Sequence, residues 1–136
     1  MTLTRRQWEK KLDTIFSVFI RYRDKLMCKR CRKQYDQLEK GIQCSHYWSR
    51  RHRGTRWDET NCEALCGGCH IYLGGNPSLH REHKLKRIGQ AEFDKLEYRA
   101  RTHTKFCLSD LSVLYDLYVV KVETLVDRYD LPEFKF

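Results

Sequence analysis

The chain contains two C-x2-C pairs, Cys28-Lys-Arg-Cys31 and Cys66-Gly-Gly-Cys69, which are separated by 34 residues. A C-x2-C turn lets two thiolates converge on one ion, and two such turns complete the tetrahedral four-cysteine shell of structural zinc. The basic residues within and beside the first pair lower thiol pKa values and favour the thiolate form. The alternatives are two unrelated reduced pairs or a redox-active turn. We predict one structural Zn²⁺, whose binding contributes directly to the free energy of folding.

Three further cysteines, Cys44, Cys62 and Cys107, lie outside these pairs. The odd total of seven argues against a full disulfide framework and indicates metal or thiol chemistry in a reducing compartment. We interpret each of the three as a small buried residue rather than a ligand. Cys44 and Cys62 are close enough to the other motifs to be kept as reserve ligands.

His46, Asn61 and His70 lie between and directly after the cysteine pairs. Hydrolysis of a phosphodiester needs a base that activates water, a group that holds the tautomer of that base, and a cation at the scissile phosphate. Two histidines and an asparagine can divide these tasks. A lone histidine is more often structural or exposed, so the spacing of all three carries the prediction.

That spacing resembles the HNH, or ββα-metal, nuclease motif, in which strand, loop, strand and helix present the three residues on one surface. The resemblance implies that His46 is the general base, that Asn61 fixes the geometry around it, and that His70 is a ligand of a catalytic Mg²⁺ or Mn²⁺. It also implies an α+β fold, with a zinc-stapled ββα-metal core, an N-terminal helix and C-terminal helices.

The flanking segments narrow the resemblance. "FIRYRD" precedes the first cysteine pair, "HYWSRR" begins at His46, "RWDETN" ends at Asn61, and "GGN" and "RIGQAEFDKLE" follow the second pair. This order is similar to the phage NinG family, also called Rap, over about residues 8–100. The resemblance implies a phage- or prophage-encoded endonuclease that cuts branched recombination intermediates, including Holliday junctions and D-loops.

Two positions depart from these patterns. Ser45 occupies the place before the catalytic histidine where many HNH proteins carry a second metal ligand. Asp58, His80 and His83 are candidates for that ligand, with water and phosphate as the alternative. His70 stands where NinG-type sequences often have asparagine, and histidine is the better ligand for a transition metal. His80 and His83 share a helix face, where contact with phosphate is equally plausible.

The loop between His46 and Asn61 carries four arginines and no acidic residue before Asp58. Guanidinium groups bind phosphate oxygens bidentately, and four neighbouring positive charges repel one another unless an anion joins them. We predict that the loop contacts the DNA backbone, with a merely solvated loop as the alternative. The four arginines are Arg50, Arg51, Arg53 and Arg56.

Aromatic residues accompany this loop. Trp48 and Trp57 could stack on unpaired bases near a branch point, but tryptophan in a small zinc domain is more often part of the core. Tyr47 follows His46 directly, and strand alternation predicts that it faces the opposite side of the sheet.

The 136 residues suit one domain with a modest core, and the formal net charge of +9 indicates a polyanionic partner such as DNA. Residues 1–33 hold eleven Lys or Arg against three acids, whereas residues 107–136 hold three against six. No run approaches the roughly 18 apolar residues of a membrane span, and the first residues lack the apolar core of a signal peptide. We therefore expect an intracellular protein, in the cytoplasm of a bacterial host.

Hydrophobic periodicity and capping residues outline the elements. A helix is predicted over residues 4–26 from a Thr4–Gln7 capping box, with its basic residues either solvated or in contact with DNA. Strands are expected near residues 43–48 and 60–65, and helices over 77–88, from Asn76 and Pro77 to Gly89, and over 90–102. A periodic helix from Ser109, over residues 111–129, is predicted to be core, with a homodimer contact as the alternative.

These features predict a single domain over residues 1–136. It comprises a basic N-terminal helix (1–27), a zinc-bound ββα core (28–88) and C-terminal helices (89–136). The expected function is that of a divalent-metal-dependent DNA endonuclease. A non-catalytic, zinc-dependent DNA-binding accessory protein is the main alternative, and Ser45 favours it. A zinc-stapled protein-interaction domain is a third, although it leaves the basic N-terminal segment without a partner.

Overall fold

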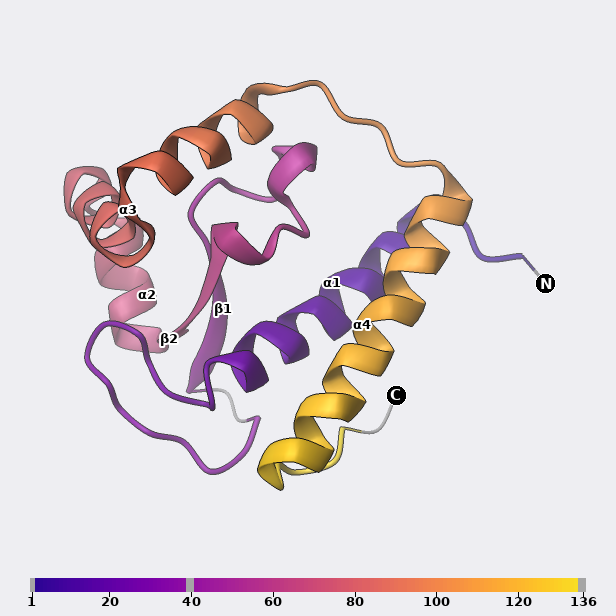
Figure 1. The fold of residues 1–136 in the computed structure, drawn as a ribbon, viewed down its shortest axis with the longest axis horizontal. Helices are drawn as coiled ribbons and strands as arrows, with labels where there is room; N and C mark the ends of the chain where they lie inside the picture. Colours follow the sequence, from indigo (N-terminus) through magenta and orange to yellow (C-terminus); the bar gives the residue numbers. More distant parts are fainter. Residues whose placement is uncertain (1, 39–40, 135–136) are drawn as a thin grey trace.

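The computed structural model describes residues 2–38 and 41–134. It is a mixed α+β structure in which a small antiparallel sheet lies between two groups of helices (Figure 1). The expectation of an α+β fold is therefore confirmed. The elements are α1 (Arg5–Arg23), β1 (Ile42–His46), the short 3-10 turns η1 (Arg53–Thr55) and η2 (Glu59–Asn61), β2 (Cys62–Cys66), α2 (Gly67–Gly74), α3 (Pro77–Arg101) and α4 (Leu108–Tyr129).

Helix α1 begins where the sequence predicts. The Gln7 backbone N–H donates to the Thr4 hydroxyl, and the Thr4 N–H donates to the Gln7 side chain, so the capping box is formed. The helix ends at Arg23, earlier than predicted, because Lys25 and Leu26 adopt positive φ values of 57° and 56°. These two residues turn the chain towards the first cysteine pair.

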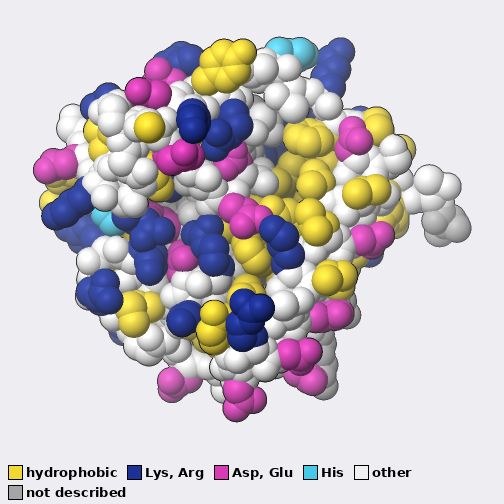
Figure 2. Space-filling model, viewed as in Figure 1, with side chains coloured by type: hydrophobic (Ala, Val, Ile, Leu, Met, Phe, Trp, Pro, Cys, Tyr) yellow, Lys and Arg dark blue, Asp and Glu magenta, His cyan; other side chains and the backbone are white. Residues whose placement is uncertain are grey.

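Helices α1 and α4 pack along each other and form much of the hydrophobic core (Figure 1). The periodic face of α4 buries Leu111, Tyr118 and Val122, and the Tyr118 ring meets Phe16 of α1 edge-on with 5.0 Å between ring centroids. The interpretation of this face as core is confirmed up to Val126, because α1 covers it, whereas Tyr129 at its end is exposed. The opposite face of α4 leaves hydrophobic side chains exposed, and they lie at the right of Figure 2.

The two strands place alternate residues on different sides of the sheet. In the antiparallel register His46 pairs with Cys62, and Ser45 pairs with Glu63. Directly opposed residues share a face, and the ring of His46 lies beside Phe16 of α1, with 6.3 Å between centroids. The His46–Cys62 face therefore looks towards α1, and the Ser45–Glu63 face looks towards α3. Both strands lie within a few residues of their predicted positions.

Helices α2 and α3 cover the other side of the sheet. The predicted stop at Gly89 is confirmed, because this residue interrupts α3 with φ 83° and ψ 163°, values that favour glycine. Pro77 occupies the first helical turn, but the Asn76 side chain donates to the Tyr72 carbonyl instead of capping α3. Helix α2 was not predicted as a separate element. Within the described residues, no helix combines the length and hydropathy that a membrane crossing requires.

Candidate zinc cluster and histidine pocket

The first cysteine pair lies in a turn shaped by backbone hydrogen bonds. The Cys28 N–H donates to the Lys33 carbonyl, and the Arg32 N–H donates back to the Cys28 carbonyl, both at 2.9 Å. Arg32 has a φ of 66°, which tightens the turn. The Lys29 N–H donates to the Ala64 carbonyl, so this turn is attached to β2. The second pair needs no such loop, because Cys66 ends β2 and Cys69 lies in the first turn of α2.

The four cysteine sulfurs converge. Their Sγ atoms all lie within 4.8 Å of one another, and those of Cys31 and Cys66 are 3.7 Å apart. Tetrahedral zinc with Zn–S bonds of about 2.3 Å places its sulfurs roughly 3.8 Å apart. The Cys69 N–H also points at the Cys66 sulfur, at 3.4 Å. The donor set and its spacing therefore fit one structural zinc ion, held by Cys28, Cys31, Cys66 and Cys69.

Local electrostatics of this cluster favour thiolate formation at one end. Burial raises the pKa of Cys28, but hydrogen bonds from the backbone N–H groups of Cys66, Cys31 and Arg30 outweigh burial and lower the pKa to about 6. The Arg30 guanidinium contacts the Cys69 sulfur at 3.4 Å. Burial and the neighbouring thiols nevertheless raise the pKa of Cys69 to about 12. A divalent ion would therefore displace protons as it binds.

A second feature is an open pocket of about 400 Å³ between α1, β1 and α2. Two of the three candidate catalytic residues, His46 and His70, line it together, whereas Asn61 does not. Cys44 also faces it. The remaining lining residues are Asp13, Ser17, Ser49 and Arg50.

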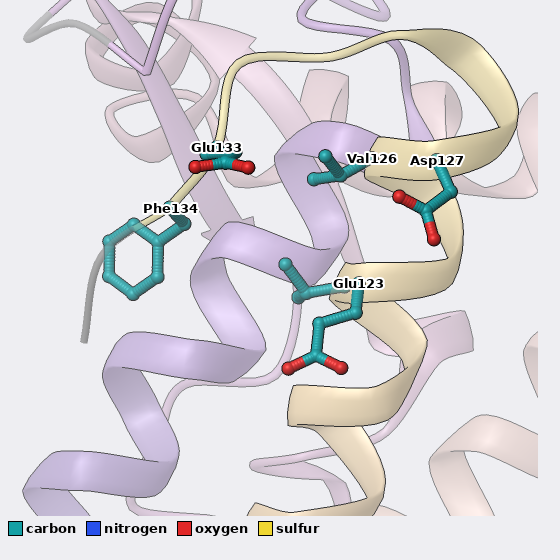
Figure 3. A pocket seen from close by; sticks show the side chains of 6 residues that line it. Glu123, Val126, Asp127, Glu133 and Phe134 are labelled. Carbon is teal, nitrogen blue, oxygen red and sulfur yellow. The ribbon is translucent and has the colours of Figure 1, made fainter.

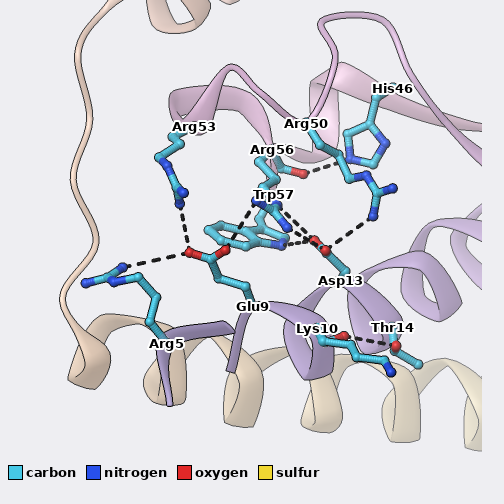
Figure 4. Close-up of polar contacts among 10 residues, drawn as sticks. All are labelled: Arg5, Glu9, Lys10, Asp13, Thr14, His46, Arg50, Arg53, Arg56 and Trp57. Atoms are coloured by element: carbon cyan, nitrogen blue, oxygen red, sulfur yellow. Dashed lines mark hydrogen bonds and ion pairs between the residues drawn. The ribbon is translucent and has the colours of Figure 1, made fainter. Parts of the chain in front are cut away.

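The imidazole of His46 is held in one tautomer. Its Nε2 lies 2.9 Å from the Arg56 carbonyl oxygen (Figure 4). A carbonyl oxygen only accepts, so Nε2 carries the proton and the neutral ring keeps a lone pair on Nδ1. Burial lowers the pKa of His46, which keeps the ring neutral near pH 7. The result is an oriented imidazole with one free basic nitrogen.

His70 is oriented in the complementary way. Its Nδ1 lies 2.5 Å from the side-chain oxygen of Gln43, which accepts a hydrogen bond from Nδ1–H, so the lone pair is on Nε2. Burial lowers the pKa of His70 as well. Hydrogen bonding of the second nitrogen is the usual arrangement for a histidine that ligates a metal. Among the described residues, however, no group of three potential ligands includes His70.

Asn61 lies beneath the loop that follows β1 and is fully buried. Its side chain accepts from the Trp48 N–H at 2.8 Å and donates to the Trp48 carbonyl at 2.9 Å. It also donates to the Thr55 carbonyl at 3.0 Å. Asn61 thus fixes both ends of the segment between Trp48 and Thr55, and the next residue, Arg56, offers its carbonyl to His46.

The loop arginines have acidic partners that the local sequence does not reveal. Arg56 pairs with Asp13 at 2.6 Å, Arg50 contacts Asp13 at 3.3 Å, and Arg53 pairs with Glu9 at 2.9 Å (Figure 4). Both acids lie on α1, which crosses beneath the loop. Carboxylates of the protein itself therefore pair with three of the four arginines. The fourth, Arg51, is exposed and forms no hydrogen bond or ion pair with the part of the chain that the structure describes.

The residues proposed as a second metal ligand do not line the pocket. Asp58 pairs with Arg99 at 2.6 Å, and His83 contacts Glu63 at 2.6 Å on the α3 side of the sheet. His80 packs against Tyr47, with 4.9 Å between ring centroids. Ser45 is buried on that same side.

The two tryptophans, for both of which the core was the preferred interpretation, differ in burial. Trp57 is core, with 7% of its surface exposed, and its indole N–H donates to Asp13 at 2.9 Å. Trp48 is half-buried and meets His52 edge-on. Tyr47 packs against Phe93 of α3, so the prediction that it faces away from His46 is confirmed.

Sequence reasoning missed two groups at this site. The pairing of Glu9 and Asp13 with the loop arginines joins residues some 40 positions apart, and no local pattern predicts it. The second is the grouping of His46 with Cys44 and Cys62, which the sequence offered only as reserve ligands. One potential ligand atom from each of the three lies within 4.8 Å of the others. The alternation of side chains along a strand could have predicted this group, because Cys44 and His46 are two residues apart and Cys62 begins the paired strand.

Another hollow lies at the far end of α4, between its last turns and the segment that follows (Figure 3). It is lined by Glu123, Asp127 and Glu133 together with Val122, Val126 and Phe134, and its volume is about 350 Å³. Its acidic lining is unsuited to a phosphate backbone, so we do not assign it to the same site.

The fold and the cysteine cluster define a small α+β protein with a site suited to structural zinc. A model of the family described as bacteriophage lambda NinG protein matches residues 2–127. The chain therefore belongs to the NinG family, a phage family related to recombination. Comparison with curated proteins gave no match. Comparison with solved structures also gave no match.

Proposed function

We propose that the protein is a divalent-metal-dependent DNA endonuclease of the HNH type. The observation that carries this proposal is the orientation of His46 in the open pocket. Its Nε2 proton is committed to the Arg56 carbonyl, so Nδ1 is left as an acceptor, and the pocket that His46 lines also contains His70. A hairpin followed directly by a helix presents the two histidines, in the order typical of a ββα-metal core.

His46 would act as the general base. The neutral ring that burial maintains can accept a proton from water at Nδ1, and the Arg56 carbonyl stabilises the imidazolium that results. Asn61 would act as a positioning residue, because its three hydrogen bonds hold the segment that leads to Arg56. A base of this kind contributes roughly 10²- to 10⁴-fold to the rate.

His70 would offer its Nε2 to the catalytic ion. An imidazole suits a transition ion such as Mn²⁺. Mg²⁺ in the same place would take its other ligands from water and substrate phosphates. When bound there, the ion would supply charge stabilisation at the scissile phosphate. The role of Gln43 is to hold the His70 tautomer that leaves Nε2 available.

We propose DNA contacts for the arginine loop, in which the four arginines differ in how available they are to bind phosphate. Arg51 is exposed and unpaired within the described residues, and Arg50 is largely exposed at the pocket rim beside Asp13. Arg53 and Arg56 are already paired with α1, so they would contact DNA only by exchanging a carboxylate for a phosphate. A branched substrate, such as a Holliday junction or D-loop, is proposed from membership of the NinG family.

A non-catalytic DNA-binding accessory protein is the second candidate. The observation that favours it is Ser45, which is 2% exposed and lies on the face of the sheet away from His46. The position that supplies a metal ligand in many HNH proteins therefore gives neither a ligand nor access to the pocket.

Cleavage assays would separate the two candidates. The protein, loaded with one equivalent of Zn²⁺ to fill the four-cysteine cluster, is incubated with linear duplex, single-stranded, D-loop and four-way junction DNA, with and without Mg²⁺ or Mn²⁺. We expect metal-dependent cutting of the branched substrates and a loss of roughly 100-fold or more in His46→Ala. His103→Ala is the matched control, because His103 is an exposed histidine outside the pocket.

Two results would overturn the nuclease proposal. One is wild-type protein that binds every substrate and cuts none under any metal, which would support the accessory role. The other is His46→Ala cleaving as fast as wild type while zinc content and circular dichroism are unchanged.

A further inference from the structure

We propose that Cys44, His46 and Cys62 form a second metal site, which takes a thiophilic cation such as Zn²⁺. The site shares the imidazole of His46 with the proposed nuclease centre. The proposal that the ion binds is argued from the geometry alone. The effect of the bound ion on DNA cleavage rests on the proposed function.

The hairpin brings the three ligands together. His46 pairs with Cys62 across the strands, and Cys44 precedes His46 by two residues on the same face. One potential ligand atom from each residue lies within 4.8 Å of the others. Tetrahedral zinc with bonds of about 2.0–2.3 Å to nitrogen and sulfur needs separations somewhat below 4 Å. Side-chain rotation would have to bring the ligand atoms to these separations as the ion binds.

The surroundings of His46 suit a ligand. A metal-bound histidine usually donates its other ring N–H to a backbone carbonyl or a carboxylate, which fixes the ring. In this protein the Arg56 carbonyl accepts from Nε2, so Nδ1 is the nitrogen with a lone pair. The Asn61 hydrogen bonds hold the segment before Arg56, so this support is itself rigid.

Positive charge lies close to both thiols. Arg21 interacts electrostatically with Cys44, and Arg23 and Lys84 do so with Cys62. The Arg23 guanidinium also donates to the Cys62 carbonyl at 2.7 Å. Such neighbours stabilise thiolates. Burial nevertheless raises the pKa of Cys62 well above its ordinary value, so the ion would displace the thiol proton as it binds. The two thiolates then formed would neutralise the charge of a divalent ion.

The site differs from a structural zinc site in its openness. It has three protein ligands, and Cys44 and His46 both line the 400 Å³ pocket. Zinc sites with three protein ligands keep a fourth position for water or an incoming group. Mg²⁺ prefers oxygen ligands and would not compete for the thiolates.

Occupancy has a direct consequence for the proposed nuclease. An ion bound at Nδ1 takes the lone pair that the general base needs. Zinc at this site would therefore suppress cleavage while Mg²⁺ is still present. The four-cysteine cluster would remain filled, because it shares no ligand with the second site.

Metal stoichiometry tests the site independently of any activity. The full chain is equilibrated with excess Zn²⁺, passed through a desalting column and measured for zinc per protein, and parallel samples are titrated with Co²⁺ to record thiolate-to-cobalt charge-transfer bands. We expect two ions for wild type and one for Cys44→Ser and Cys62→Ser. The matched control Cys107→Ser, which changes an exposed cysteine outside both clusters, should keep two.

Results contrary to the proposal are equally clear. One ion in the wild type, or two in Cys44→Ser, would overturn it. Because Cys62 is buried, Cys62→Ser could fail to fold, and the half-buried Cys44 then provides the decisive variant.

A cleavage assay then compares, for wild type and for each variant, the rate of DNA cleavage with and without the second equivalent of Zn²⁺. We expect an inhibition approaching about 100-fold in wild type, the lower end of what a general base contributes, and little change in Cys44→Ser. Two ions without zinc inhibition would overturn the shared role of His46. If no DNA is cut under any condition, the nuclease proposal fails, while the stoichiometry still decides the metal site.

Discussion

Strand β2 begins at Cys62 and ends at Cys66, and each of these cysteines belongs to a different cluster. At the Cys66 end, four sulfurs come from two turns whose backbone N–H groups point at the thiolates. At the Cys62 end, two sulfurs and one imidazole come from neighbouring strands beside an open pocket. The two ends lie only four residues apart along β2.

The difference shows how one short strand can serve stability and chemistry at once. A closed shell of four thiolates leaves an ion no coordination position for substrate. The free energy of metal binding can therefore contribute to folding. A set of three ligands beside a pocket leaves room for a reacting group. We therefore expect variants at the Cys66 end to affect the fold, and variants at the Cys62 end to affect metal content and cleavage.

The largest effect is expected from Cys28→Ser, which breaks the closed cluster. Structural zinc contributes on the order of 10 kcal/mol, which is comparable to the whole stability of a domain at roughly 5–15 kcal/mol. The variant should lose its near-ultraviolet circular dichroism and its cooperative urea transition. Cys44→Ser should keep both. An unfolding free energy of Cys28→Ser within about 1 kcal/mol of wild type would contradict the structural role.

The next effect is expected from Glu63→Gln, on the opposite face of β2. Glu63 is 2% exposed, contacts His83 at 2.6 Å and pairs with Arg87, and it lies near the buried Lys84. Loss of one partner from a buried ionic group costs about 3–5 kcal/mol. Urea denaturation at pH 7 measures this loss. The matched control is Glu92→Gln, an exposed residue whose change should be nearly neutral.

The same residue predicts a pH dependence. Burial raises the pKa of Glu63, but the His83 hydrogen bond and the charges of Lys84 and Arg87 outweigh burial and lower it. A depressed carboxyl pKa contributes stability above the unfolded pKa, and this stability is lost as the pH falls through the folded pKa. The gap between wild type and Glu63→Gln should therefore narrow below about pH 4.5. A gap that is constant with pH would contradict this assignment.

A smaller effect is expected from Asn61→Ala, next to the open cluster. The change removes three hydrogen bonds and takes away the partner of the Trp48 N–H and carbonyl, whereas the Thr55 carbonyl keeps the bond that it accepts from the Asp58 N–H at 3.3 Å. At about 1 kcal/mol each, the loss is about 3 kcal/mol. Chemical denaturation gives the value, and Asn76→Ala, which removes one exposed hydrogen bond, is the control. A loss as small as that of the control would show that Asn61 does not hold the loop.

Much of the fold could be predicted from local chemistry. The Thr4–Gln7 capping box, the interruption at Gly89 and the buried face of α4 are consequences of residue types at fixed spacing, and the structure contains all three. The Asn76 side chain was expected to cap α3, but it turns back to the Tyr72 carbonyl instead. Capping would use the amide oxygen to accept from a backbone N–H of α3, whereas the observed contact uses the amide nitrogen to donate to a carbonyl. The sequence does not rank these two arrangements.

The candidate site was less predictable, because its electrostatics are tertiary. The arginine loop contains no acid before Asp58, yet Glu9 and Asp13 on α1 pair with three of its four arginines. The Cys44–Cys62 proximity depends on strand register, which a shift of one residue would abolish. The convergence of the two C-x2-C pairs was predictable, because thiolate chemistry permits few other arrangements.

The smallest effect is expected from Arg53→Gln at the rim of the arginine loop. Its pair with Glu9 is 2.9 Å long, but 43% of the arginine side chain is exposed. Exposed pairs contribute about 0.5 kcal/mol and are screened by salt. Urea midpoints at low and high NaCl should show a small loss that disappears at high salt, and Arg51→Gln should show none. A loss that persists at high salt would mean that the pair is better shielded than its exposure indicates.

The pairing of α1 with α4 has a consequence for how the chain is made on the ribosome. Seven buried residues of α1 are synthesised first, but the helix that covers many of them follows only after residue 108. At a synthesis rate of about 5–20 residues per second, this apolar surface stays uncovered for several seconds until α4 is made. All four cysteines of the candidate zinc cluster are synthesised earlier, by residue 69. Metal capture can therefore organise the nascent hairpin beside α1 and shorten the interval in which a chaperone would be needed.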